Sequence, residues 1–177
     1  TMYQIKPKLD SFVSNGGTLV YGVCDSGWAE GISEKIIPGD VMIGEVDYIY
    51  NNYIADPTHP IVNAELSDGI PLKNEQLYNK YASHRYFDVN TLPENTKVIL
   101  TAGENKPTLI EYPIGKGVVI GSTLTWEHSY NDSSNRFGRR AFDDLLLYAY
   151  NIVFVDEDIN FTSDIYTNKK QYSTNED

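Results

Sequence analysis

The residues best suited to covalent chemistry are the only cysteine of the sequence, Cys24, and a distant histidine, His128. A cysteine thiolate is a nucleophile, and an adjacent imidazole lowers the pKa of the thiol and carries protons. Cys24 directly follows a predicted buried strand, Thr18–Val23, and open α/β sheets place ligands and nucleophiles at such strand ends. Cys24 and His128 therefore form a candidate catalytic pair, with Glu127 or Asp132 as the carboxylate that could orient the imidazole.

The same cysteine also has an interpretation without chemistry. A lone cysteine at the end of a buried strand can serve simply as a small apolar residue. Contact between Cys24 and His128 requires that the two strands preceding them are neighbours in the sheet. Both interpretations stay open on the sequence alone.

Aromatic and acidic residues flank the same two strand ends. They are Asp25, Trp28, Glu30, Trp126, Glu127 and Tyr130. Aromatic faces can stack on sugar rings while carboxylates accept hydrogen bonds from sugar hydroxyls, so Asp25, Trp28, Trp126 and Tyr130 form a candidate ligand-binding site for carbohydrate. A carboxylate pair could also serve glycoside hydrolysis, but only at defined separations. The alternative is that the two tryptophans seal the edge of the core.

The sequence predicts neither a metal site nor a cofactor. His59 and His84 have no partner at ligand spacing, so we assign them to surface or turn positions. The acidic residues after position 155 do not match a calcium-binding EF-hand loop. Gly115-Lys116-Gly117 lacks the spacing of a phosphate-binding loop and falls in a predicted hairpin.

Hydrophobic spacing predicts the elements that position these residues. Met2–Asn15 has apolar residues at helical intervals, and the glycines that follow end this helix directly before the strand Thr18–Val23. Arg140–Phe154 is amphipathic and predicts a final helix. Between them, short β-rich stretches predict an antiparallel meander of three strands, which are Lys97–Thr101, Thr108–Tyr112 and Gly117–Thr125.

The middle and the end of the chain have weaker patterns. Val41–Tyr50 is a possible strand region and Lys73–Tyr81 a possible helix. Residues 1–155 are expected to form one α/β domain, and residues 156–177 an acidic and polar tail that acts as an edge strand, over Ile159–Tyr166, or as a linker. Because the domain begins with a helix while parallel sheets need several strands, we expect a missing N-terminal half of the domain to lie upstream in the same polypeptide.

Composition limits the partners. With 25 acidic and 14 basic residues the net charge is −11, which argues against binding to nucleic acid or to anionic lipid. A single cysteine excludes an internal disulfide, and no apolar run is long enough to span a bilayer. Many Tyr, Asn and Thr residues with almost no cysteine are typical of a bacterial surface protein, so we expect an extracellular or cell-surface location.

Two motifs and the final helix resemble class I glutamine amidotransferase-like domains. Phe12-Val-Ser-Asn-Gly-Gly-Thr-Leu-Val20 is similar to their helix-to-strand step, and Tyr112-Pro-Ile-Gly-Lys-Gly-Val-Val-Ile-Gly121 to the hairpin before their last strand. The helix Arg140–Asn151 takes the position of their last helix. The superfamily has a flavodoxin-like sheet, and it includes ThuA-like domains and the trimerisation domains of some β-galactosidases. The resemblance implies a partial flavodoxin-like three-layer sandwich.

The resemblance also implies where a nucleophile would lie. In the amidotransferases the strand after the Gly-Gly step ends in G-x-C-x-G, and Gly22-Val23-Cys24 matches its first three positions. The second glycine comes one residue late, at Gly27. The partner histidine of those enzymes lies in His-Pro-Glu after the last strand, whereas here Glu127 precedes His128.

These observations lead to one expected function and one alternative. We expect a non-catalytic amidotransferase-like module of a larger, surface-exposed bacterial protein, with a structural or carbohydrate-binding role. The alternative is a cysteine-dependent hydrolase or amidotransferase-type enzyme that uses the Cys24–His128 pair.

Overall fold

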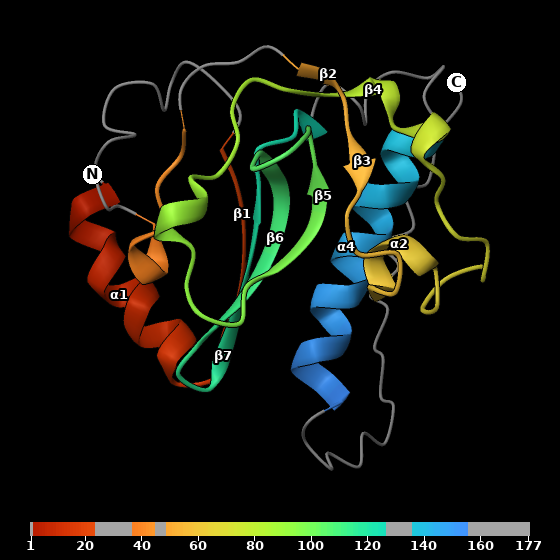
Figure 1. Ribbon diagram of the computed structural model, residues 1–177. Coiled ribbons are helices and arrows are strands. Elements are labelled where there is room, and N and C mark those ends of the chain that lie inside the picture. Colours follow the sequence, from red (N-terminus) through yellow and green to blue (C-terminus); the bar gives the residue numbers. More distant parts are fainter. Residues whose placement is uncertain (1, 24–36, 45–48, 127–135, 156–177) are drawn as a thin grey trace, which may run out of the picture.

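Five strands form one mixed sheet in the order β1-β7-β6-β5-β3 (Figure 1). The computed structural model describes residues 2–23, 37–44, 49–126 and 136–155. The strands of the sheet are β1 (Thr18–Gly22), β3 (Tyr53–Ile54), β5 (Lys97–Thr101), β6 (Pro107–Ile114) and β7 (Gly117–Ser122). β1 pairs with β7 in parallel, and the other neighbours pair antiparallel. The predicted antiparallel meander of β5, β6 and β7 is confirmed.

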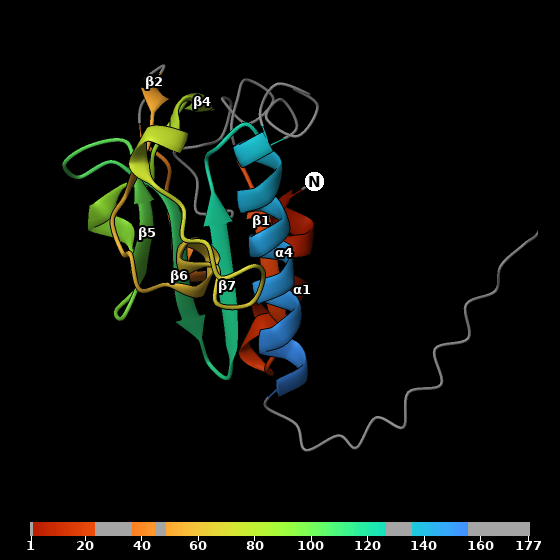
Figure 2. The ribbon, with the colours of Figure 1, turned by 90° about the vertical axis from the view of Figure 1, so that its right-hand side faces the viewer.

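Helices cover both faces of this sheet. On one face lies α1 (Met2–Ser14), and on the other lie α4 (Arg136–Val155) and the short α2 (Pro60–Asn63), as Figures 1 and 2 show. Short 3-10 turns join the strands, and they are η2 (Pro38–Asp40), η3 (Asn74–Gln76) and η4 (Val89–Thr91). The described residues thus form three layers of a mixed α/β fold, as expected, while the finer flavodoxin-like assignment stays a prediction.

Alternating side chains divide the core between the two faces. Leu109 and Ile120 belong to the cluster under α4 and α2, whereas Ile110 and Val119 belong to the cluster under α1. This alternation follows from the two-residue period of a strand. The central strands are buried on both faces because both faces are covered, which explains their continuous apolar sequence.

A glycine-rich contact joins α1 to the β6–β7 hairpin. A side chain at Gly117 would collide with the backbone oxygens of Val13 and Gly17, so only glycine fits there. Gly16, at φ 112°, ends the helix in a conformation that other residues avoid. Lys116 N donates to Ser14 O at 3.1 Å. The two sequence motifs that carry the family resemblance therefore touch each other in space.

One of the predicted elements differs from the structure, and another is described only in part. The possible helix Lys73–Tyr81 is wrong, because η3 occupies only three of its residues and β4 (Tyr78–Ser83) follows. β4 pairs antiparallel with β2 (Ile49–Asn51), so a distant strand decides its conformation. Of the possible strand Val41–Tyr50, the described residues include a bridge at Ile43 and the start of β2, and residues 45–48 lie outside the described residues.

The remaining predicted boundaries shift by only a few residues. α4 begins four residues before the predicted start at Arg140, and β7 ends at Ser122 rather than Thr125. None of the described helices has an apolar stretch long enough to cross a membrane.

Candidate functional site

The two strands expected to carry the site end side by side. β1 and β7 pair in parallel register up to Gly22 and Ser122, and Val23 N then donates to Ser122 O at 2.8 Å. The carboxyl ends of adjacent parallel strands meet at one edge of a sheet, where ligands of α/β proteins bind. Cys24 follows Val23 directly in sequence, and Trp126 follows Ser122 by four residues. The expected proximity of the two strand ends is therefore confirmed.

Most of the predicted site residues lie outside the described residues. They are Cys24, Asp25, Trp28, Glu127, His128 and Tyr130. The Cys24–His128 pair and the carbohydrate site consequently stay predictions at the level of side chains.

Trp126 is the predicted site residue that the structure describes. It is 8% exposed and belongs to the core cluster beneath α4, where its ring lies 5.4 Å from that of Phe142. This placement is the one expected of a tryptophan that seals the core edge. A sugar-stacking role at this edge would then depend on Trp28 and Tyr130.

Buried hydroxyl and amide groups lie beneath the strand ends. Thr108 Oγ1 donates to Asn52 Oδ1 at 2.6 Å, and Thr123 N donates to Thr108 O at 2.9 Å. Ser122 Oγ accepts a hydrogen bond from Leu124 N at 3.1 Å. These contacts fix the chain where it leaves β7. No sequence pattern predicted these contacts, because in two of the three cases the partners are 15 and 56 residues apart.

His59 and Glu111 form a buried hydrogen-bonded pair that sequence reasoning missed. His59 is 2% exposed, and its Nε2 lies 3.2 Å from Glu111 Oε2. Ile61 N donates to His59 Nδ1 at 3.3 Å, so Nδ1 is the acceptor and Nε2 carries the proton donated to Glu111. The expected turn position of His59 is confirmed by its place as the N-cap of α2, but a surface position is wrong.

Two further residues complete this network. Lys97 Nζ donates to Glu111 Oε1 at 2.6 Å, and the Tyr148 hydroxyl also bonds to Glu111. The rings of Tyr148 and His59 meet edge to face at 4.8 Å. The residues come from β6, β5, α4 and the N-cap of α2, so the network ties α2 and α4 to the sheet. The network could not be predicted from the sequence because His59 and Glu111 are 52 residues apart.

The charge of Glu111 depends on these partners. Burial by itself raises the pKa of this carboxyl, but the hydrogen bonds from His59, Lys97 and Tyr148 outweigh burial and lower the pKa to about 2. Burial and the neighbouring Glu111 charge raise the pKa of the Tyr148 hydroxyl. Glu111 is thus an ionised carboxylate with both oxygens engaged, which suits a structural anchor better than an acid or base.

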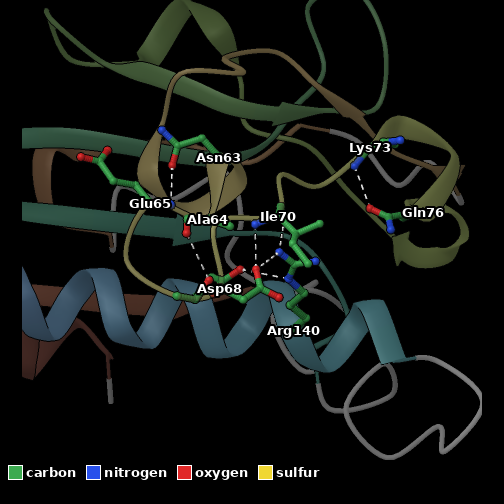
Figure 3. Close-up of polar contacts among 10 residues, drawn as sticks. Asn63, Ala64, Glu65, Asp68, Ile70, Lys73, Gln76 and Arg140 are labelled. Carbon is green, nitrogen blue, oxygen red and sulfur yellow. Dashed lines mark hydrogen bonds and ion pairs between the residues drawn. The ribbon is translucent and has the colours of Figure 1, made fainter.

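A second polar contact holds the loop after α2 against α4 (Figure 3). Arg140 Nη2 donates to Asp68 Oδ1 at 2.6 Å and also to the carbonyl oxygen of Ile70. Asp68 Oδ1 accepts a further bond from Ile70 N at 2.9 Å. One turn along α4, the buried Asp144 carboxylate faces Arg140 Nε at 3.8 Å. Burial raises the pKa of Asp144, and Arg140 opposes that rise.

Within the part of the chain that the structure describes, no group of three His, Cys, Asp or Glu residues could hold a metal ion. The described residues thus form an α/β chain in which β1 and β7 end side by side and in which the polar networks join helices to the sheet.

Comparison with known proteins gives distant similarities. No family model matches the chain. An uncharacterised protein of Clostridium acetobutylicum is 26% identical over 128 residues, which is 72% of this chain and 12% of that protein. The chain therefore spans about an eighth of the length of this curated relative, whose bacterial source agrees with the origin expected from composition.

Two solved structures are similar in part. An exo-β-1,4-mannosidase, Op5Man5, from Opitutaceae bacterium strain TAV5 aligns with a TM-score of 0.46 and 19% identity over 82% of this chain and 23% of its own. A cold-adapted β-galactosidase from Rahnella sp. R3 aligns with a TM-score of 0.45 and 14% identity over 82% of this chain and 21% of its own.

Proposed function

We propose that the chain is a non-catalytic, amidotransferase-like module of a larger, surface-exposed bacterial protein. The observation that carries this proposal is the state of the described residues best suited to chemistry. Trp126 is packed in the core, and the His59–Glu111 pair is buried with its polar atoms engaged. Such residues stabilise a fold. The module would act through its surfaces, with another part of the same polypeptide as one partner and a carbohydrate as a candidate ligand.

The carbohydrate role is tested by binding to a glycan array. We expect binding that falls at least tenfold when Trp28→Ala removes one of the aromatic faces predicted to stack on the sugar. Tyr50→Ala is the matched control, because Tyr50 is an exposed aromatic residue of the separate β2–β4 ribbon. If no glycan on the array binds in a way that requires Trp28 or Tyr130, the carbohydrate role is contradicted and the structural role remains.

The parallel pairing of β1 and β7 favours one alternative, a cysteine-dependent hydrolase or amidotransferase-type enzyme. Because the strands end side by side, the segments that carry Cys24 and His128 leave the sheet at neighbouring points. In the enzyme, Cys24 would be the nucleophile and His128 the base, with Glu127 as the carboxylate beside it.

Alkylation by iodoacetamide at neutral pH separates the two functions. A non-catalytic module should react slowly at Cys24, at a rate that His128→Ala leaves unchanged. Fast alkylation that His128→Ala abolishes would establish the enzyme, because only a thiolate paired with that imidazole reacts in this way. His84→Ala is the control, since it removes another histidine.

A further inference from the structure

β1 lies at one edge of the sheet, and no strand of the described residues pairs with its outer side. Gly17 O accepts from Val118 N at 3.2 Å and Val23 N donates to Ser122 O, so the odd-numbered residues of β1 bond to β7. In a parallel ladder, alternate residues bond to opposite sides. The N–H and C=O groups of Thr18, Val20 and Gly22 therefore point away from β7. We call this row the β1 edge.

Helix α1 shows exposed apolar residues toward the β1 edge. Its buried residue, Val13, faces the sheet, and its flank toward β6 is held to η2 by an ion pair of Lys6 and Asp40 at 3.2 Å. At 3.6 residues per turn, Ile5 and Phe12 lie about 100° from Val13 on the other flank. Both are exposed, Phe12 by 54%. Lys6 lies about 20° from Val13 on the other side from Ile5 and Phe12, so the exposed apolar flank of α1 is turned away from η2.

Helix α4 repeats this arrangement on the other face. Leu145 is buried against the sheet, and Tyr148 turns toward α2, where it meets His59. Leu146 and Tyr150 lie on the opposite flank from Tyr148 and are exposed, Tyr150 by 59%. α2 is held over β6, and β6 and β1 lie on opposite sides of β7. The flank of α4 that is turned away from α2 therefore faces the β1 edge. Both helices therefore carry exposed apolar side chains on the side of one unpaired strand edge.

The geometry points to an added parallel strand at the β1 edge, apolar on both faces and supplied by the segment that precedes α1 in the polypeptide. This inference rests on the proposed role as one part of a larger protein, and it names the partner and its contact. A strand covered by α1 on one face and by α4 on the other must be apolar on both, as in parallel sheets of other α/β proteins.

The handedness of strand–helix–strand connections selects this segment. Figure 2 shows α4 in front of the sheet, α1 behind it, and β1 at the end of the row beyond β7. Such connections between parallel strands are right-handed in about 98% of cases. With α1 on its observed face, a right-handed unit places the strand before α1 on the side of β1 away from β7. That side is the β1 edge.

Two other occupants fit less well. Ile159–Tyr166 alternates apolar residues with Asn160, Thr162 and Asp164, so its sequence lacks a second apolar face. A second copy would bring together two chains that each carry a net charge of −11.

Amide hydrogen exchange along β1 tests the inference in the full-length polypeptide. We expect Thr18, Val20 and Gly22 to be protected as strongly as Leu19 and Tyr21, whose N–H groups face β7. In Thr1–Asp177 alone, Leu19 and Tyr21 should stay protected while the other three exchange rapidly. Rapid exchange of those three residues in the full-length polypeptide would overturn the inference.

Other outcomes would assign the edge elsewhere and equally overturn the inference. Protection that persists in monomeric Thr1–Asp177 places the occupant within this chain, and protection that rises with dimer formation indicates a second copy. If Thr1–Asp177 loses protection at Leu19 and Tyr21 as well, Val20→Pro in the full-length polypeptide decides. Proline removes the backbone N–H of residue 20, which would pair with the added strand. The melting temperature of Val20→Pro should therefore be several degrees below that of Val20→Ala, and equal melting temperatures would count against the added strand. Hydrogen exchange tests the added strand, whereas alkylation of Cys24 tests the non-catalytic role. The two proposals can therefore fail independently.

Discussion

The two edges of the sheet are finished in different ways. The β3 edge is short, with two residues, and Ile54 N donates to the side chain of Asn74 at 2.7 Å. The β1 edge is five residues long, and exposed apolar residues of α1 and α4 stand on both sides of it. Natural sheets blunt a free edge by shortening it or by covering it with polar groups. The contrast supports the proposal that the sheet ends at β3 and that a further strand extends it beyond β1.

The same contrast extends to the helices. On the β3 side, α2 and α4 are held by the Glu111 network and by the contacts of Arg140. On the β1 side, the outward flanks of α1 and α4 are apolar. Substitutions on the β3 side should therefore change the stability of the chain itself, and those on the β1 side should change its association.

The largest effect is expected from breaking the Glu111 network. Glu111→Leu leaves the buried His59 Nε2–H without its acceptor, and an unsatisfied buried donor costs about 1–3 kcal/mol of unfolding free energy. Urea unfolding measures this cost. Glu104→Leu, in an exposed turn, is the control and should change stability by less than about 0.5 kcal/mol. Equal unfolding midpoints for the two variants would show that the network does not hold the β3 side.

Acid should weaken the same side of the molecule. The pKa of Glu111 is lowered in the folded chain to about 2 from its ordinary value of 4.5, so the folded state binds the proton less well than the unfolded state. Its contribution to stability is complete above the unfolded pKa and is lost as the pH falls from about 4.5 toward 2. Unfolding midpoints measured across this range should fall less steeply in Glu111→Gln than in the wild-type chain. Parallel curves would contradict the assignment.

A smaller effect is expected at the clamp between α4 and the loop after α2. Arg140→Ala removes the bonds to Asp68 and Ile70 and leaves the buried Asp144 carboxylate without its counter-charge. We expect a loss of about 1–2 kcal/mol, reduced from the value of a buried pair because Asp68 is half exposed to solvent. Thermal unfolding measures it. Arg140→Lys keeps the charge but not the planar fork, so its stability should lie between those of Arg140→Ala and the wild-type chain.

Local patterns predicted the elements well, and long-range contacts were missed. α1, β1, the meander and α4 were predicted because their apolar periodicity and their short connections are local features. The helix expected over Lys73–Tyr81 was wrong because pairing with β2 overrides the local preference of β4.

The candidate site was predictable in position but not in its contacts. The parallel pairing of β1 and β7 brings the predicted strand ends together. The burial of His59 depends on Glu111, a charged residue inside an apolar strand whose partners come from three other parts of the chain. No local pattern encodes such a contact.

The smallest effect on the chain itself is expected on the β1 side of α4, where two adjacent leucines make a matched pair. Leu146→Ala removes an exposed side chain that faces the β1 edge, so it should change the unfolding free energy of Thr1–Asp177 by less than about 0.5 kcal/mol. Leu145→Ala empties a core position and should cost about 2–5 kcal/mol. In the full-length polypeptide the cost of Leu146→Ala should rise toward that of Leu145→Ala, because an added strand would bury Leu146. A cost for Leu146→Ala that is equally small in both proteins would mean that the apolar flank of α4 stays exposed and that the two edges of the sheet differ for another reason.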